Sequence, residues 1–256
     1  MESLRVLLPP SEGKASGGDG SAYDPRFGSF AGLLGPREKV RKALRHKDFD
    51  AATQLGVRGE ALIAARGANA AIATCPTLPA LRRYTGVLYD ALGYAGLPAE
   101  LRARLDEDVV IVSGLMGVVR GGDPVPNYKA PMGAALPGVG RLASFWKPYL
   151  AKVLARDLAG AVVWDLLPGI HAAAAPVTSA GVHWKVRVLR EANGRLTTVS
   201  HENKTIKGAL ARVVVGGRIT DPAALGSWTG PGGYRLRKVT DPESGAAGIV
   251  ELVAAR

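Results

Sequence analysis

Four polar residues that could do chemistry follow a short apolar segment near the middle of the chain. Residues 109–112 are β-branched, and they predict a buried strand. The polar residues that come after it are Ser113, Arg120, Asp123 and Tyr128. Side chains at strand ends, and in the loops that follow them, often bind ligands in α/β proteins. Arg120 could hold an anion while Asp123 or Tyr128 moves a proton.

A purely structural interpretation of the same segment remains open. Gly114 and Gly117 could serve only the backbone freedom of a tight turn after the strand. Arg120 and Asp123 could form an ion pair inside the loop.

Lysines occupy three further positions where they could meet an anion. Lys14 lies in a glycine- and serine-rich loop after residues 4–8, which predict the first strand. The glycine spacing of a Walker motif is absent from this loop. Lys204 and Lys207 lie at the start of a predicted helix. With the four polar residues above, these lysines are the candidate catalytic residues, provided that the fold brings them together.

The charge of the chain favours a polyanionic or phosphorylated partner. The 256 residues include 33 Lys and Arg against 22 Asp and Glu, a net charge of +11. The alternative is that this excess serves solubility and reflects an arginine-rich composition.

Other bulk features point to a cytoplasmic protein with a sizeable core. Hydrophobic residues make up 47% of the chain, yet no apolar run is long enough to cross a membrane. The N-terminus lacks the features of a signal peptide. Cys75, the single cysteine, cannot form an internal disulfide, and cysteine-based zinc sites are excluded. We expect neither a membrane partner nor a cofactor.

A basic helix and a glycine-bearing hairpin form the candidate nucleic-acid interface. Residues 37–47 predict a helix that carries Arg41 and Lys42. Residues 51–66 predict two short helices joined by a hairpin with Gly56, Arg58 and Gly59. Such hairpins can offer backbone N–H groups to phosphates. An ordinary helical corner with a solvated basic face is the alternative.

A second glycine-bearing string, Leu136-Pro-Gly-Val-Gly-Arg-Leu-Ala143, also resembles a helix-hairpin-helix consensus. Pro126 and Pro131 leave little room for a helix before it, whereas residues 144–157 predict a helix after it. We interpret this string as a helix entry.

The remaining patterns predict a mixed fold. Asn193-Gly194 is the strongest hairpin signal, and it lies between strands at 182–189 and 196–200. Further strands are predicted at 161–164, 234–239 and 248–253. We expect a single compact α/β (mixed α+β) domain over residues 1–256, with a mixed sheet, flanking helices and a helix-hairpin-helix element at 37–66.

Several motifs resemble those of the YaaA family of bacterial peroxide stress proteins. The most specific is Ser113-Gly-Leu-Met-Gly-Val-Val-Arg120, with the later Tyr128 and Met132-Gly133. Supporting motifs are Pro9-Pro-Ser-Glu-Gly-Lys14, Tyr84-Thr-Gly86 with Tyr89, Phe145-Trp146, Lys204, Lys207-Gly208 and Gly233-Tyr234.

The resemblance implies an unusual single-domain α/β fold with a positively charged cleft. It also implies a role in limiting free iron, and hence oxidative DNA damage, during peroxide stress. DNA binding through a helix-hairpin-helix element is part of that implication, and residues 56–59 match the element by position.

One segment departs from the family pattern. Where the family commonly has Asn-Leu-Ala-Ser-x-Glu-Tyr, this chain has Asp165-Leu-Leu-Pro-Gly-Ile-His171. The loss of the Glu-Tyr pair puts a shared polar site there in doubt. His171 either replaces a lost polar group or is incidental.

Three functions follow from these patterns. The first is sequence-nonspecific binding of double-stranded DNA through phosphate contacts. The alternative is an enzyme acting on a phosphorylated or nucleotide-like small molecule in the basic cleft. Direct iron binding has the least support, because only the role implied by the resemblance suggests it. The histidines show no helical pairing, and His183 and His201 with Glu202 near the predicted hairpin are the one candidate group.

Overall fold

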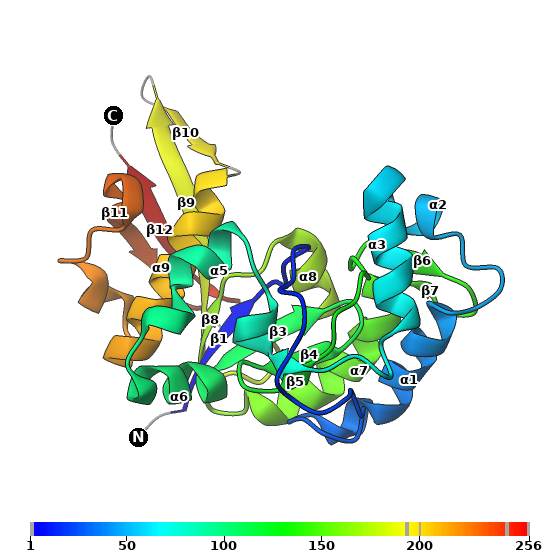
Figure 1. Ribbon diagram of the computed structural model, residues 1–256. Coiled ribbons are helices and arrows are strands. Elements are labelled where there is room, and N and C mark those ends of the chain that lie inside the picture. Colours follow the sequence, from blue (N-terminus) through cyan, green and yellow to red (C-terminus); the bar gives the residue numbers. More distant parts are fainter. Residues whose placement is uncertain (1–2, 193–194, 200, 244–245, 255–256) are drawn as a thin grey trace.

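A twisted mixed sheet lies at the centre of the molecule (Figure 1). The computed structural model describes residues 3–192, 195–199, 201–243 and 246–254. Within them the strand order is β11-β12-β9-β8-β1-β3-β4, and β10 pairs with β9. The strands are β1 (Leu4–Leu8), β3 (Val109–Ser113), β4 (Gly117–Arg120), β8 (Val162–Asp165), β9 (Val182–Ala192), β10 (Arg195–Thr198), β11 (Arg235–Thr240) and β12 (Gly248–Ala254).

The parallel strands place their carboxyl ends at one edge of the sheet. β1 runs parallel to β3 and β8, and β9 runs parallel to β8 and β12. β4, β10 and β11 are antiparallel to their partners. The carboxyl edge therefore collects the loops that follow β1, β3 and β8, which is the usual place for a site in such sheets.

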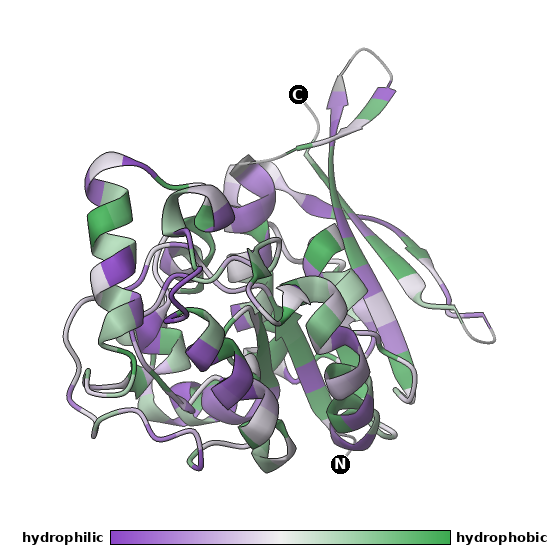
Figure 2. Ribbon diagram, turned by 90° about the vertical axis from the view of Figure 1, so that its right-hand side faces the viewer, coloured by the Kyte–Doolittle hydropathy of each residue, from purple (hydrophilic) through white to green (hydrophobic). Residues whose placement is uncertain are grey.

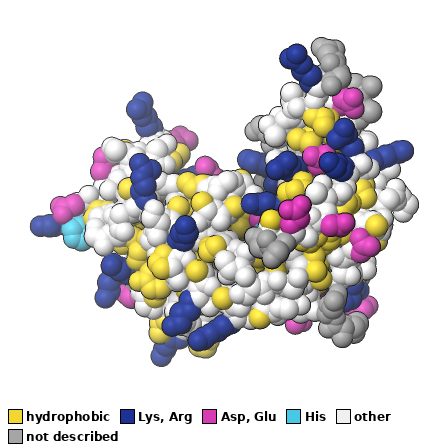
Figure 3. Space-filling model, turned by 180° about the vertical axis from the view of Figure 1, so that it is seen from behind, with side chains coloured by type: hydrophobic (Ala, Val, Ile, Leu, Met, Phe, Trp, Pro, Cys, Tyr) yellow, Lys and Arg dark blue, Asp and Glu magenta, His cyan; other side chains and the backbone are white. Residues whose placement is uncertain are grey.

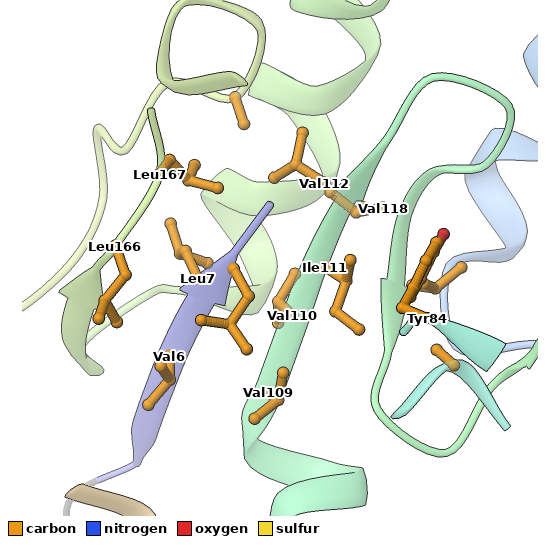
Figure 4. Packing of buried hydrophobic residues seen from close by; sticks show 14 of the residues in the cluster. Val6, Leu7, Tyr84, Val109, Val110, Ile111, Val112, Val118, Leu166 and Leu167 are labelled. Atoms are coloured by element: carbon orange, nitrogen blue, oxygen red, sulfur yellow. The ribbon is translucent and has the colours of Figure 1, made fainter. Parts of the chain in front are cut away.

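Near-continuous apolar runs explain why the central strands are buried on both faces. Val6 and Leu7 of β1 pack beside Ile111 of β3 and Leu166 after β8 (Figure 4). Colouring by hydropathy shows the same apolar centre, with polar residues concentrated on the surrounding helices (Figure 2). One hydrophobic cluster connects the sheet to the helices.

Helices pack around this sheet. α9 contacts α5 and α6, α6 and α9 contact β1, and α7 contacts β4. The α-helices are α1 (Leu34–Ala43), α2 (Ala51–Leu55), α3 (Gly59–Ala70), α4 (Ala80–Arg83), α5 (Val87–Leu92), α6 (Ala99–Asp108), α7 (Leu142–Asp157), α8 (Gly169–Ala174) and α9 (His201–Gly217). Short 3₁₀ turns lie at Ala31–Leu33, Tyr94–Gly96, Pro222–Leu225 and Pro231–Gly233. Two-residue strands pair as β2 (Leu78–Pro79) with β5 (Pro124–Val125) and as β6 (Ala135–Leu136) with β7 (Gly140–Arg141).

Two projections rise from the side of the molecule where the strands end. One consists of α2 and α3, and the other consists of the distal part of β9 with β10 (Figure 1). The space-filling view from behind shows a broad saddle between them (Figure 3).

The sequence-based fold class is confirmed, with local corrections. The predicted strands and the hairpin of β9 with β10 are present, while its turn, Asn193-Gly194, lies outside the described residues. The segment after β3 is not a loop, because β4 returns antiparallel to β3 and buries Val118 and Val119. α6 was not predicted from the sequence. Within the described residues, no helix combines the length and apolar character needed to span a membrane.

Candidate functional site

Lys14 lies at the carboxyl edge of the sheet against two tyrosine rings. Its backbone forms a β-bridge with Tyr84, so the loop after β1 is tied to the segment after α4. The Lys14 ammonium donates to the carbonyl of Ser11 at 3.1 Å. It lies 4.2 Å from the ring centroid of Tyr128 and 5.5 Å from that of Tyr84. The contact with the Tyr128 ring is a cation–π interaction when Lys14 is charged.

The charge state of Lys14 is unusual for a lysine. Burial, with the like charge of Lys129, lowers the pKa of Lys14 to about 7. Glu12 opposes this shift, but among the described residues no carboxylate forms an ion pair with Lys14. Near neutral pH, a large fraction of Lys14 is therefore an uncharged amine.

Three buried hydroxyl groups form a chain behind Lys14. The Tyr128 hydroxyl lies 2.6 Å from Ser113 Oγ and 2.8 Å from the Tyr84 hydroxyl. Ser113 Oγ also accepts from the backbone N–H of Met116 at 3.1 Å. Burial raises the pKa of Tyr128 well above its ordinary value, so the chain is a neutral network. The structure thus brings Lys14, Ser113 and Tyr128 together, as the sequence suggested.

A cluster of charges surrounds the mouth of this site. Lys129 Nζ donates to Glu12 Oε2 at 2.8 Å. This hydrogen bond holds the pKa of Glu12 below its ordinary value, and the charges of Lys14 and Lys204 act in the same direction. Lys204 on α9 is therefore close enough to influence the same carboxylate.

His171 on α8 lines a cavity of about 80 Å³ together with Lys14, Tyr128 and Lys129. Its Nδ1 atom is buried and has no hydrogen-bond partner in the described part of the chain. Burial lowers the pKa of His171 to about 4, which keeps the ring neutral at physiological pH. His171 therefore occupies the site rather than being incidental, although the Glu-Tyr pair of the family pattern is absent here.

A second cavity of about 220 Å³ shares Glu12, Lys14, Tyr128 and Lys129 with the first. Its opposite wall is apolar and comes from the α2–α3 projection. The residues of that wall are Val57, Ala61, Ala64, Ala65 and Ala68.

Lys207 is held inside the fold close to this edge. It is buried on α9 and donates to the carbonyl of Leu166 at 2.9 Å. Burial lowers the pKa of Lys207, and the charge of Asp165 opposes the shift. The Asp165 carboxylate accepts from the backbone N–H of Leu167 at 2.9 Å. Lys207 thus stabilises the carboxyl end of β8.

Two of the candidate catalytic residues lie elsewhere. Arg120 stands opposite Val110 in the β3–β4 hairpin, three residues before Ser113. At about 3.3 Å per residue, this places Arg120 about 10 Å from Ser113 along the strand. Its guanidinium bonds the Glu107 carbonyl and pairs with Asp157.

The Asp123 carboxylate also has a structural environment. It accepts from the Ser29 hydroxyl at 2.7 Å, the Ser29 backbone N–H at 3.0 Å and the Arg120 backbone N–H at 2.8 Å. The suggested ion pair between Arg120 and Asp123 is therefore wrong, because the Arg120 side chain turns to Asp157.

Gly114 and Gly117 are required for more than a flexible turn. A Cβ atom at Gly114 would lie 2.0 Å from the carbonyl oxygen of Ala130, so this glycine lets the two segments approach closely. Gly117 has φ +71°, and a Cβ there would lie 2.7 Å from the Trp146 ring. Gly114 thus lets the segment after Tyr128 pack against the end of β3, and Gly117 lets Trp146 of α7 pack against the start of β4.

The candidate nucleic-acid residues divide into a free and a neutralised group. Gly56 and Gly59 adopt φ +65° and +56° on either side of Arg58, which is exposed and forms no ion pair in the described part of the chain. Arg41, by contrast, pairs with Glu38 at 2.6 Å, and Lys42 lies 3.9 Å from the same carboxylate.

The residues suggested for iron do not form a group. His183 Nε2, near the start of β9, lies 3.4 Å from Asp165 Oδ2. Glu202 instead binds Arg190 and the Tyr234 hydroxyl. Arg190 lies seven residues after His183 on β9, about 23 Å away at the usual strand rise. The side chain of His201 lies outside the described part. Among the described residues, no cluster of three metal-binding side chains occurs.

The sequence interpretation did not include Glu12, Lys129, Tyr84 or His171 in the site. Lys129 directly follows Tyr128, and Tyr84 belongs to a quoted motif, so both had a local signal. For His171 the signal was its place in the segment that departs from the family pattern, and its position in the site depends on how α8 packs beside the loop after β1.

A mixed α/β protein with a lysine-containing site at the carboxyl edge of its sheet is the class that this geometry defines. A family model described as peroxide stress protein YaaA matches residues 4–239. A UPF0246 protein of Streptomyces coelicolor is 36% identical over 228 residues, which cover 82% of each chain. A UPF0246 protein of Corynebacterium glutamicum is 36% identical over 215 residues, covering 82% of this chain and 84% of that one. One from Corynebacterium efficiens is 37% identical over 214 residues, with the same coverage. The chain belongs to the YaaA peroxide stress protein family.

Proposed function

We propose that this protein binds double-stranded DNA through its phosphates, without reading base sequence. The observation that carries the proposal is the α2–α3 hairpin, in which Arg58 stands exposed between Gly56 and Gly59. An open hollow of about 710 Å³ is lined by Ala52, Thr53, Gly56 and Arg58. Backbone N–H groups at the start of α3 and the Arg58 guanidinium suit a phosphate in that hollow.

The second projection supports the same proposal. Lys185 and Arg187 are exposed on β9, and Arg195 is exposed on β10. Figure 3 shows Lys and Arg side chains gathered around this projection, across the saddle from the α2–α3 hairpin. A duplex in the saddle would meet basic side chains from both projections. We therefore propose that the saddle is the positively charged cleft.

Binding of this kind offers a physical route to protection during peroxide stress in the cytoplasm. Basic side chains that neutralise phosphates release condensed cations from DNA. Bound protein would therefore displace ferrous iron from the backbone, where peroxide chemistry damages DNA. We propose this route for the limitation of iron-driven damage.

Fluorescence anisotropy of a labelled random duplex at several salt concentrations tests the proposal. We expect affinity to fall linearly in log salt, and Arg58→Glu to lower that slope by about one or two charges. Arg156→Glu is the matched control, because Arg156 is exposed at the far end of α7 and forms no ion pair in the described chain. Equal effects of the two substitutions, or no binding at low salt, would contradict the proposal.

A second candidate function is an enzyme that acts on a phosphorylated or nucleotide-like small molecule in the basic cleft. The half-buried Lys14, its hydroxyl chain and the Nδ1 of His171, which no described residue binds, favour it, because a passive DNA surface needs none of these groups. Calorimetric titration with nucleoside monophosphates and inorganic phosphate tests this candidate. Loss of a measured affinity in Lys14→Met would support it, and no heat from any of these ligands would count against it.

A further inference from the structure

Lys14 has the environment of an amine nucleophile rather than that of a phosphate-binding cation. Among the described residues its Nζ donates one hydrogen bond, to the carbonyl of Ser11, and it lies over the face of the Tyr128 ring. Desolvated lysines next to another cation lose their proton readily and attack carbonyl carbons. Lys129 supplies that cation, and burial supplies the desolvation.

The cavities show what can reach this amine. Lys14 lines both the cavity of about 80 Å³ and the adjoining one of about 220 Å³. Val57, from the hairpin proposed to hold a phosphate, lines the second cavity opposite Lys14. A DNA strand whose phosphate rests on the hairpin would thus bring an adjacent sugar towards Lys14.

Intact DNA offers no free carbonyl on its sugar, whereas an abasic deoxyribose does. When the base is lost, the sugar ring opens to an aldehyde at C1′, and a small cavity is sufficient because no base must be accommodated. The alanine wall of α3 also offers no side-chain hydrogen bonds that would read a base. We propose that Lys14 forms an imine with the aldehyde of an abasic site in DNA. This inference rests on the proposed DNA binding.

The chemistry balances without an oxidant or a cofactor. The Lys14 Nζ lone pair attacks C1′, and the carbonyl oxygen takes one proton from the amine and one from solvent and leaves as water, which gives a protonated imine. Loss of a proton from C2′ then allows the C3′–O bond to break, and the 3′-phosphate leaves with the electron pair. Water hydrolyses the conjugated imine, which restores the amine and leaves an unsaturated aldehyde on the cut strand.

His171 is the group placed to accept the C2′ proton. It lines the same small cavity as Lys14, and its buried Nδ1 is unused by the described residues. The ring is neutral at physiological pH, so its lone pair is free, and its lowered pKa makes it a weaker base than an ordinary histidine. His171→Ala should therefore keep imine formation while slowing strand cleavage.

Reductive trapping tests the proposal directly. The protein is mixed with a duplex containing one abasic site, borohydride is added, and the covalent complex is measured on a denaturing gel. We expect wild type to trap and Lys14→Arg to lose at least about tenfold of the trapped complex, because arginine keeps a long basic side chain but lacks the amine nucleophile. Lys152→Met, which removes an exposed lysine of α7, should trap like wild type. Peptide mapping should place the adduct on Lys14.

Two further measurements separate the possible failures. A duplex with a tetrahydrofuran abasic analogue has no aldehyde, so its binding reports DNA affinity alone. Binding of that duplex without trapping overturns the imine and leaves the DNA proposal intact, whereas no binding removes both. If formaldehyde and cyanoborohydride label Lys14 while the abasic duplex fails to trap, the carbonyl partner is a free small molecule and the proposed DNA source is wrong.

Discussion

The two edges of the central sheet use similar side chains in opposite ways. At the amino edge, Arg5 contacts Asp108 and Asp157, and Arg120 also binds Asp157. At the carboxyl edge, Lys129 pairs with Glu12, and Lys14 and Lys204 are close enough to influence the same carboxylate. Charges that are matched within the fold compensate one another, whereas basic groups without a matching carboxylate are available to a ligand. The residue types alone do not distinguish the two situations, but their pairing does.

The largest expected change in stability comes from removing the carboxylate of Asp123, just after β4 at the amino edge of the sheet. Asp123→Ala leaves the N–H groups of Ser29 and Arg120 without their acceptor, and we expect a loss of about 3 kcal/mol in the free energy of unfolding. DNA affinity of the folded protein should not change. Urea unfolding measures this loss. The control variant, Asp48→Ala on the exposed surface, should change the free energy of unfolding by less than about 0.5 kcal/mol. A small loss of unfolding free energy in Asp123→Ala would contradict the structural role that we assign to the amino edge of the sheet.

The hydroxyl chain at the other edge should show a smaller stability effect. Tyr128→Phe removes the hydroxyl that contacts both Ser113 and Tyr84, at an expected loss of about 1–2 kcal/mol. Tyr149→Phe, at a partly exposed ring of α7, is the matched control for urea unfolding. If both variants unfold alike, the buried chain contributes nothing to stability.

Lys14 should instead affect how the free energy of unfolding depends on pH. Its pKa falls from 10.5 to about 7 in the folded protein, so between these values the unfolded chain binds more protons. The contribution of Lys14 to the free energy of unfolding therefore rises with pH over this window. The charged and titratable groups facing Lys14 are Lys129, Glu12, Arg83, Tyr84, Tyr128 and His171.

Urea unfolding at about pH 7.5 and about pH 9 measures this dependence. The rise between the two should be smaller in Lys14→Met than in wild type, because methionine does not titrate. Lys152→Met should keep the rise, since Lys152 is exposed. An unchanged rise in Lys14→Met would show that Lys14 stays charged.

The smallest effect is expected at a basic residue that already has a partner. Lys42→Gln leaves Glu38 paired with Arg41, so the salt slope of DNA binding should change less than in Arg58→Gln. Anisotropy titrations of both variants at several salt concentrations measure the two slopes and so compare a basic residue that has an acidic partner with one that has none among the described residues. A larger effect at Lys42 would move the DNA surface from the hairpin to α1.

The sequence predicted those elements whose signal is local. Apolar runs located β1, β3 and β8, and alternation located β9. The grouping of Lys14 with Ser113 and Tyr128 followed from the positions of strand ends. The sequence predicts a loop where β4 lies, and the antiparallel return of β4 carries Arg120 and Asp123 away from Ser113 along the sheet. His171 entered the site through the packing of α8, for which the chain has no short-range pattern.

The pairing of β1 also has a consequence for synthesis. β1 is made early, but Val6 pairs with Val109, and Leu4 pairs with Val162. At about 5–20 residues per second on the ribosome, this apolar segment waits roughly 10 s or longer before both neighbouring strands exist. During translation Leu4–Leu8 is therefore a candidate for chaperone binding, and the sheet closes around it only after β8 has emerged.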